Sequence, residues 1–226
     1  ESSIIDSGTG APTGTWVRDG VTTWGNKSLV STGYSGAPTL GGQTVIQTFY
    51  AGGTAGGFDP QRMELHNLAN GSRELFFGAE FQIASNYPTS SSSGGGKQFI
   101  IWFTGGGRYI LNFDVGLASG NWSIYRDSTS TYTSNTPITY GDWVKVEWYL
   151  NRGTGAADGS MQVWIDGNLA INQSGITFPT GDFDYMVDDG ANNGNRPYTG
   201  VSPETRIIAS TYPGAPVDAY RWTSIL

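Results

Sequence analysis

A stretch of alternating apolar and polar residues constrains the fold of this chain most strongly. Residues 144–150 alternate Val, Trp and Leu with Lys, Glu and Tyr. After a glycine-rich turn, residues 161–165 alternate Met, Val and Ile with Gln and Trp, and an Asp-Gly pair follows at Asp166 and Gly167. A period of two is typical of a strand with one buried face, and Asp-Gly favours a tight hairpin turn. The stretch therefore predicts a long β-hairpin with one face toward a core and the other toward water or a ligand.

The composition extends this prediction to the whole chain. The 226 residues include 34 Gly, 10 Pro and many aromatic residues, and only 14% are charged, which favours short strands and tight turns over helices. Strand-like runs recur along the sequence, separated by turn-rich spacers such as residues 51–57, 90–96 and 190–200. Each spacer is short and a strand pattern resumes after it, so we read the spacers as loops. We predict an all-β fold, a two-sheet antiparallel β-sandwich of the jelly-roll type, formed by residues 1–226 as a single domain.

The hairpin also carries a family resemblance. The segments "GDWVKVEWYLN" (141–151) and "DGSMQVWIDG" (158–167) resemble the back-sheet hairpin of the concanavalin A-like lectin/glucanase superfamily. That superfamily includes laminin-G-like modules, jelly-roll polysaccharide lyases and many sugar-binding domains. The resemblance implies a concanavalin A-like jelly roll, a fold that carries several different functions.

Charge and cysteine content exclude several classes of function. The formal net charge is -7, and no cluster of Lys and Arg is present, so nucleic acid is not expected as a partner. No apolar run approaches the roughly 20 residues of a membrane span, so membrane insertion is not expected. The absence of Cys excludes disulfides, thiol catalysis and Cys-ligated zinc. The first residues contain neither Met nor a signal-peptide pattern, so we expect a mature protein or an excised module. The resemblance to the concanavalin A-like superfamily leads us to expect a protein that is secreted or displayed on a cell or virion surface.

Polar side chains alternate with the apolar set in several predicted strands, which predicts a groove lined by hydrogen-bonding groups. Sugars combine hydroxyl groups with apolar C–H faces, so their sites pair planar polar side chains with aromatic platforms. The candidate ligand-binding residues are Arg62, Glu64, His66, Glu80, Gln82, Gln98, Trp102, Asn112, Lys145, Glu147, Tyr149 and Trp164. They predict a lectin-like domain that binds a polysaccharide or cell-surface glycan on a concave sheet face. Two alternatives are an ordinary solvated sheet face and a virion or cell-surface decoration or adhesion domain without catalysis. The sequence pattern does not specify an oligomeric state.

A further alternative comes from the segment "RMELH" at residues 62–66. It resembles the Arg-x-Glu-Leu-Arg strand motif of jelly-roll alginate lyases and related enzymes, with His66 in place of the last Arg. Such lyases neutralise a uronate carboxylate and abstract the proton from the neighbouring carbon. The resemblance implies a polysaccharide lyase acting on a uronate polymer, with Arg62, His66 and Tyr149 as catalytic candidates. The lyases' Gln-x-His strand has a counterpart only at Gln98, and their Tyr-x-Lys-x-Gly-x-Tyr-x-Gln strand has none. The Glu-x-Asp-x-x-Glu motif of the glucanases is absent, which disfavours hydrolysis.

Oxygen-bearing side chains crowd into the segment that begins at residue 182. Calcium binds six to eight oxygen ligands, so the segment is a candidate structural calcium site, whereas Asp and Asn residues also suit turns. No other cofactor is expected. The candidate metal ligands are Asp182, Asp184, Asp188 and Asp189.

Overall fold

A computed structural model gives the structure of the protein. It describes residues 16–19, 27–31, 44–50, 62–66, 73–83, 85, 97–112, 120–126, 130–188 and 219–225. All regular secondary structure in these ranges is β-strand, and every pairing between strands is antiparallel. No helix long and apolar enough to cross a membrane occurs in these ranges.

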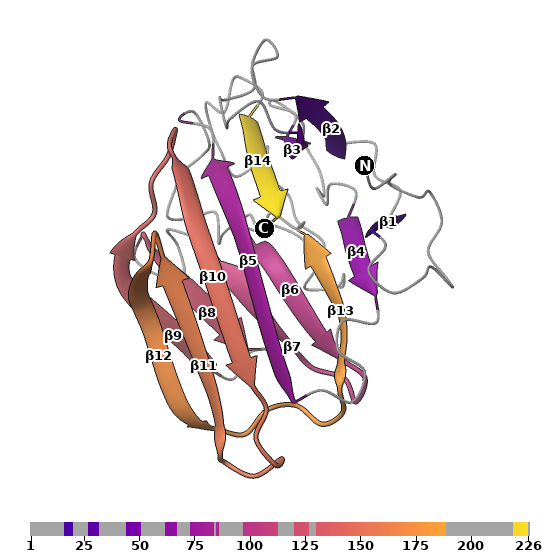
Figure 1. The fold of residues 1–226 in the computed structure, drawn as a ribbon, viewed down its shortest axis with the longest axis vertical. Coiled ribbons are helices and arrows are strands. Elements are labelled where there is room, and N and C mark those ends of the chain that lie inside the picture. Colours follow the sequence, from indigo (N-terminus) through magenta and orange to yellow (C-terminus); the bar gives the residue numbers. More distant parts are fainter. Residues whose placement is uncertain are drawn as a thin grey trace, which may run out of the picture.

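The strands form two seven-stranded sheets that stack face to face (Figure 1). Sheet A has the order β1 (Trp16–Asp19), β4 (Arg62–His66), β13 (Phe183–Asp188), β6 (Lys97–Phe103), β7 (Arg108–Asn112), β8 (Asn121–Arg126) and β9 (Ser130–Pro137). Sheet B has the order β12 (Asn168–Ile176), β11 (Gly159–Ile165), β10 (Trp143–Asn151), β5 (Glu74–Ile83), β14 (Ala219–Ile225), β3 (Thr44–Tyr50) and β2 (Lys27–Ser31). This confirms the predicted two-sheet antiparallel sandwich.

The predicted hairpin forms strands β10 and β11 of sheet B, between β12 and β5. Along β10 and β11, buried and half-buried residues alternate as the sequence period indicates. The Asp-Gly turn that follows β11 leads into β12, and both Asp166 (φ 49°) and Gly167 (φ 77°) have positive φ. Such a pair of values is typical of a type I′ turn, which matches the twist of the strands. The Asp166 carboxylate also accepts a 2.8 Å hydrogen bond from the backbone N–H of Lys145, which fixes the turn against β10.

Aromatic side chains from both sheets fill the space between them. The ring of Phe81 in sheet B lies 5.1 Å from that of Phe99 and 6.1 Å from that of Trp122, both in sheet A. Trp148 from β10 is also buried in this layer. Because the inner faces are occupied by this core, only the outer faces and the ends of the sandwich can bind a ligand.

Candidate functional site

The structure divides the predicted ligand-binding residues between the two sheets. Sheet A carries Arg62, Glu64, His66, Gln98, Trp102 and Asn112, and sheet B carries Glu80, Gln82, Lys145, Glu147, Tyr149 and Trp164. Stacked sheets lie about 10 Å apart with the core between them, so their outer faces point in opposite directions. The prediction of one groove lined by all twelve residues is therefore wrong. Each half of the set belongs to a separate surface, and glycan binding by either surface stays a prediction.

Strand β4, which carries the Arg-x-Glu-Leu-His segment, lies inside sheet A between β1 and β13. Its Leu65 is in register with Met186 of β13, which pairs in turn with Ile101 of β6, a fully buried core residue. Arg62, Glu64 and His66 occupy the alternate positions of β4. The side chains of β4 lie outside the described part of the structure, as do those of Gln98 and Asn112.

A tyrosine that the sequence analysis missed lies next to His66. Tyr185 of β13 is the direct cross-strand partner of His66. Directly opposed residues of an antiparallel pair have Cα atoms about 4.5 to 5.5 Å apart. Like that of His66, the side chain of Tyr185 lies outside the described part of the structure. The sequence contains no signal that β13 inserts between β4 and β6. The juxtaposition of His66 and Tyr185 is therefore visible only in the sheet order.

The structure corrects the assignment of Tyr149 as a catalytic partner of Arg62 and His66. Tyr149 lies on β10 of sheet B, and its neighbours Trp148 and Leu150 point into the core. The sandwich therefore separates Tyr149 from β4. Its hydroxyl instead donates a 2.6 Å hydrogen bond to the Glu74 carboxylate, which raises the pKa of Tyr149.

Trp102 and Arg108 form a cation–π pair on sheet A. The two residues are cross-strand partners, and the guanidinium carbon of Arg108 lies 4.8 Å from the centroid of the Trp102 ring. Trp102 is next to the core residue Phe103 on β6, and Arg108 is next to the core residue Tyr109 on β7, so the pair lies on the face away from the core. Arg108 is only 9% exposed, and its guanidinium lies in the position of a cation–π contact with Trp102. Because Arg108 lies over the ring, one face of the predicted Trp102 platform is already covered.

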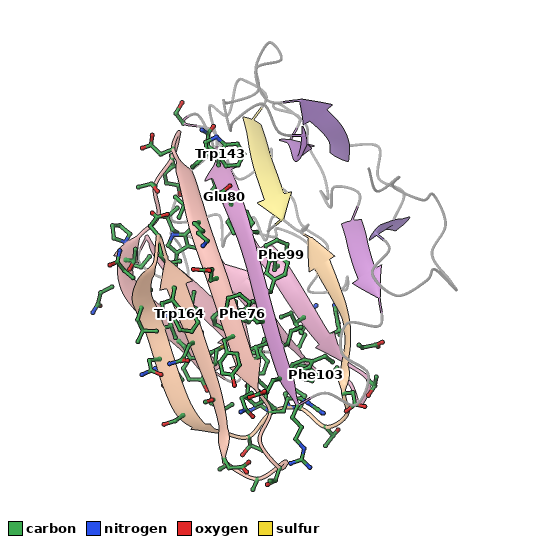
Figure 2. All side chains as sticks on the ribbon, in the orientation of Figure 1. Phe76, Glu80, Phe99, Phe103, Trp143 and Trp164 are labelled. Carbon is green, nitrogen blue, oxygen red and sulfur yellow. The ribbon has the colours of Figure 1, made fainter. Side chains whose placement is uncertain are left out.

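The predicted ligand-binding residues of sheet B lie on β10 and on its two neighbours, β5 and β11. Lys145 forms an ion pair with Glu147, with 3.0 Å between Nζ and Oε1, and is the cross-strand partner of Glu80. Trp164 of β11 is half-buried and pairs with Glu147. Gln82 is buried, so it is not available at the surface. Figure 2 shows Glu80, Trp164 and the neighbouring Phe76 on this sheet.

A cleft of about 250 Å³ lies at one end of the sandwich, away from both sets of predicted residues. Its walls include Arg73, Arg152 and residues 178–181. The Arg152 guanidinium donates a 2.6 Å hydrogen bond to the Asp182 carboxylate and another to the Gly181 carbonyl, and it lies over the ring of Phe183. These contacts hold the loop between β12 and β13 against the end of β10. The cleft is therefore bordered by an arginine that already has a structural role.

The predicted calcium ligands fall partly within the described residues. Asp182 is paired with Arg152, and Asp184 is half-buried on β13. The side chain of Asp188 and the whole of Asp189 lie outside the described ranges. Within those ranges, no three His, Cys, Asp or Glu side chains gather in a way that could hold a metal ion. A calcium site that includes Asp188 and Asp189 stays a prediction.

Comparison with known proteins relates the chain to others through its structure alone. No family model matches the sequence, and no curated protein matches it. An endo-β-1,4-glucuronan lyase from the fungus Trichoderma reesei superposes with a TM-score of 0.55 at 12% identity, covering 95% of each chain. The alginate lyase Aly36B superposes with a TM-score of 0.51 at 17% identity, covering 88% of this chain and 84% of that one. A sialidase matches with a TM-score of 0.52 at 14% identity, covering 93% of this chain and 16% of the sialidase.

These matches extend over nearly the whole sandwich at identities too low to indicate a shared activity. They agree with the resemblance found in the hairpin and with the sheet architecture described above. The chain has the concanavalin A-like jelly-roll fold.

Proposed function

We propose that the protein is a polysaccharide lyase that cleaves a uronate polymer on the outer face of sheet A. The observation that carries the proposal is the pairing of His66, the only histidine of the chain, with Tyr185 on the neighbouring strand. Arg62 lies four residues from His66 on the same strand. Structures of the same fold include a glucuronan lyase and an alginate lyase, which supports this choice over binding without catalysis.

The reaction requires three kinds of group. Cleavage by β-elimination begins when a base removes the proton from C5, next to the uronate carboxylate. Negative charge then develops on that carboxylate, and a cation or hydrogen-bond donor must stabilise it. The C4–O bond breaks as a C4=C5 double bond forms, and the departing oxygen takes up a proton from an acid. No water is consumed, and each cut leaves one unsaturated sugar end.

The residues of sheet A match these requirements. In the proposed mechanism the Arg62 guanidinium pairs with the uronate carboxylate, since a planar, permanently charged group suits a carboxylate. His66 and Tyr185 serve as the base and the acid, because imidazole exchanges protons near neutral pH and a phenol can donate to a developing alkoxide.

The test is an assay for unsaturated products on glucuronan and alginate, followed by their ultraviolet absorbance. The variants Tyr185→Phe, His66→Gln and Arg62→Met should each reduce the rate by roughly 100-fold or more, the usual contribution of a general acid, base or charge stabiliser. Tyr149→Phe is the matched control. It removes the same hydroxyl from the opposite sheet and should leave the rate unchanged.

Two outcomes contradict the proposal. The parent protein could release no unsaturated product from any uronate polymer, or Tyr149→Phe could impair cleavage as strongly as Tyr185→Phe.

Because uronate polymers of this kind lie outside cells, the proposal also implies that the protein is secreted or displayed on a cell or virion surface. Fractionation of the producing organism or particle, with detection of the protein, tests that location.

A further inference from the structure

The outer face of sheet B carries an apolar surface that the proposed lyase site does not use. Among the residues that the structure describes, two large hydrophobic side chains are exposed, Phe76 at 61% and Leu169 at 50%. Both lie on sheet B, on strands β5 and β12. Phe76 pairs with Tyr149, and Leu169 pairs with Trp164. Exposed apolar residues that gather on one face are typical of a binding surface.

These four residues lie along a diagonal across four adjacent strands, here called the apolar band: Leu169, Trp164, Tyr149 and Phe76. They come from the adjacent strands β12, β11, β10 and β5, one from each. Trp164 pairs with Glu147, and Tyr149 is the next residue of β10 on the same face, so Trp164 and Tyr149 are diagonal neighbours. The band spans roughly 16 Å between its end Cα atoms, from a strand spacing of about 4.8 Å and a two-residue step of about 7 Å.

Planar polar groups flank the apolar band on both sides of β10. Glu74 accepts hydrogen bonds from Tyr149 (2.6 Å) and from the Asn151 side-chain amide (3.2 Å). Gln162 donates a 3.4 Å hydrogen bond to the side-chain oxygen of Asn172. Ring platforms beside pre-positioned carboxylate and amide groups suit a sugar, which offers a flat C–H face and hydroxyls at its edge.

The charges of this face select among polysaccharides. Glu74, Glu80 and Glu147 lie on it, and the single cation that the structure describes among them, Lys145, is already paired with Glu147. A polyuronate is therefore repelled from the apolar band, whereas a neutral glycan is not. A second copy of the chain is a poor occupant of the band, because stable protein interfaces bury about 800 Å² on each partner. The band is a single row of four side chains, two of them half-buried, and is too small for such an interface.

We propose that the apolar band binds a neutral polysaccharide with flat sugar faces, such as a β-linked glucan, on the face of the sandwich opposite the proposed lyase site. The protein then holds two different glycans on its two sheets. Sheet A takes the uronate polymer that is cleaved, and sheet B anchors the protein to a neutral polymer that is not.

Affinity gel electrophoresis with hydroxyethylcellulose and with laminarin, two neutral β-glucans, tests this inference. At least one polymer should retard the parent protein, and the retardation should persist at high salt because the ligand carries no charge. Trp164→Ala and Phe76→Thr should each weaken binding by roughly 5- to 100-fold, the usual cost of removing an aromatic platform. Trp164→Phe keeps a ring at the same position and should retain most of the affinity.

The controls separate this inference from the proposed lyase activity. Tyr185→Phe should abolish uronate cleavage and leave retardation by the neutral polymer unchanged. Phe76→Thr should weaken retardation by the neutral polymer and leave uronate cleavage unchanged. Because Phe76 is mostly exposed, its replacement should leave the melting temperature close to that of the parent. Absence of retardation by both neutral polymers overturns the inference, as does equal retardation of the parent and both band variants. A concentration-dependent dimer in sedimentation that Phe76→Thr dissociates would instead identify the band as an interface between copies.

Discussion

Alkaline pH should destabilise the protein through Tyr109, a fully buried residue of β7. Its ring centroid lies 5.0 Å from that of Phe178 and 6.1 Å from that of Phe103. Burial disfavours the phenolate and raises the pKa of Tyr109 from 10.0 to about 12, although the nearby Arg126 guanidinium offsets part of this rise. The folded protein therefore keeps the phenol proton over a pH range in which the unfolded chain releases it.

The sign and size of the effect follow from this difference in pKa. Between the two pKa values the folded state binds more protons than the unfolded state, so the free energy of unfolding falls as the pH rises. The stabilisation is fully present below the unfolded pKa. It is reduced by about 1.4 kcal/mol at about pH 11 and by about 2.7 kcal/mol once the pH exceeds the folded pKa.

Urea unfolding of the parent and of Tyr109→Phe at about pH 8 and about pH 11 measures this contribution. Phenylalanine keeps the ring in the core and cannot ionise, and all other titrating groups are common to both proteins. The stability of the parent relative to the variant should fall by about 1.4 kcal/mol between the two pH values. An equal loss of stability in both proteins would show that Tyr109 does not titrate differently on folding, and the reasoning from burial would be refuted.

Two further perturbations test the packing of the sandwich. Trp122→Ala should lower the free energy of unfolding by roughly 3 to 5 kcal/mol in urea, because Trp122 is buried and stacks on Phe81 across the two sheets; a loss below about 1 kcal/mol would contradict its place in the core. Arg152→Ala should lower the melting temperature, since it removes the ion pair with Asp182 and the hydrogen bond to the Gly181 carbonyl. Arg152→Lys should restore only part of the loss, because one ammonium group cannot reproduce the two-pronged contact of the guanidinium; full restoration would contradict this explanation.

The sequence predicted the hairpin of β10 and β11 because the information for it is local. The alternation over residues 144–150 and the Asp-Gly turn at Asp166 and Gly167 need only neighbouring residues to be interpreted. Sheet membership is different, since β14 inserts between β5 and β3 and β13 inserts between β4 and β6. These insertions join residues that lie 80 or more positions apart, such as Phe183 and Phe103. Nothing in the period of a strand specifies its lateral neighbours.

The prediction of a single groove was wrong because the sequence does not specify which strands are neighbours in a sheet. Tyr149 and Tyr185 both occupy strands, and sequence alone offers no reason to prefer one as the partner of His66. The core decides between them: Trp148 and Leu150 direct β10 into sheet B, while Met186 of β13 is in register with Ile101. A polar position on a strand can therefore be assigned to an outer face from sequence, but not to a particular outer face.

Charge gives the two outer faces opposite preferences, and salt distinguishes them experimentally. In the proposed mechanism Arg62 of sheet A pairs with a uronate carboxylate, whereas the carboxylates of Glu80 and Glu147 lie on sheet B. Raising the salt concentration screens attraction between exposed charges and leaves contact between sugar faces and aromatic rings largely unchanged. The KM for a uronate polymer should therefore rise with salt while retardation by a neutral β-glucan stays constant. If both responded to salt alike, one surface would bind both polymers, and the division of function between sheet A and sheet B would be wrong.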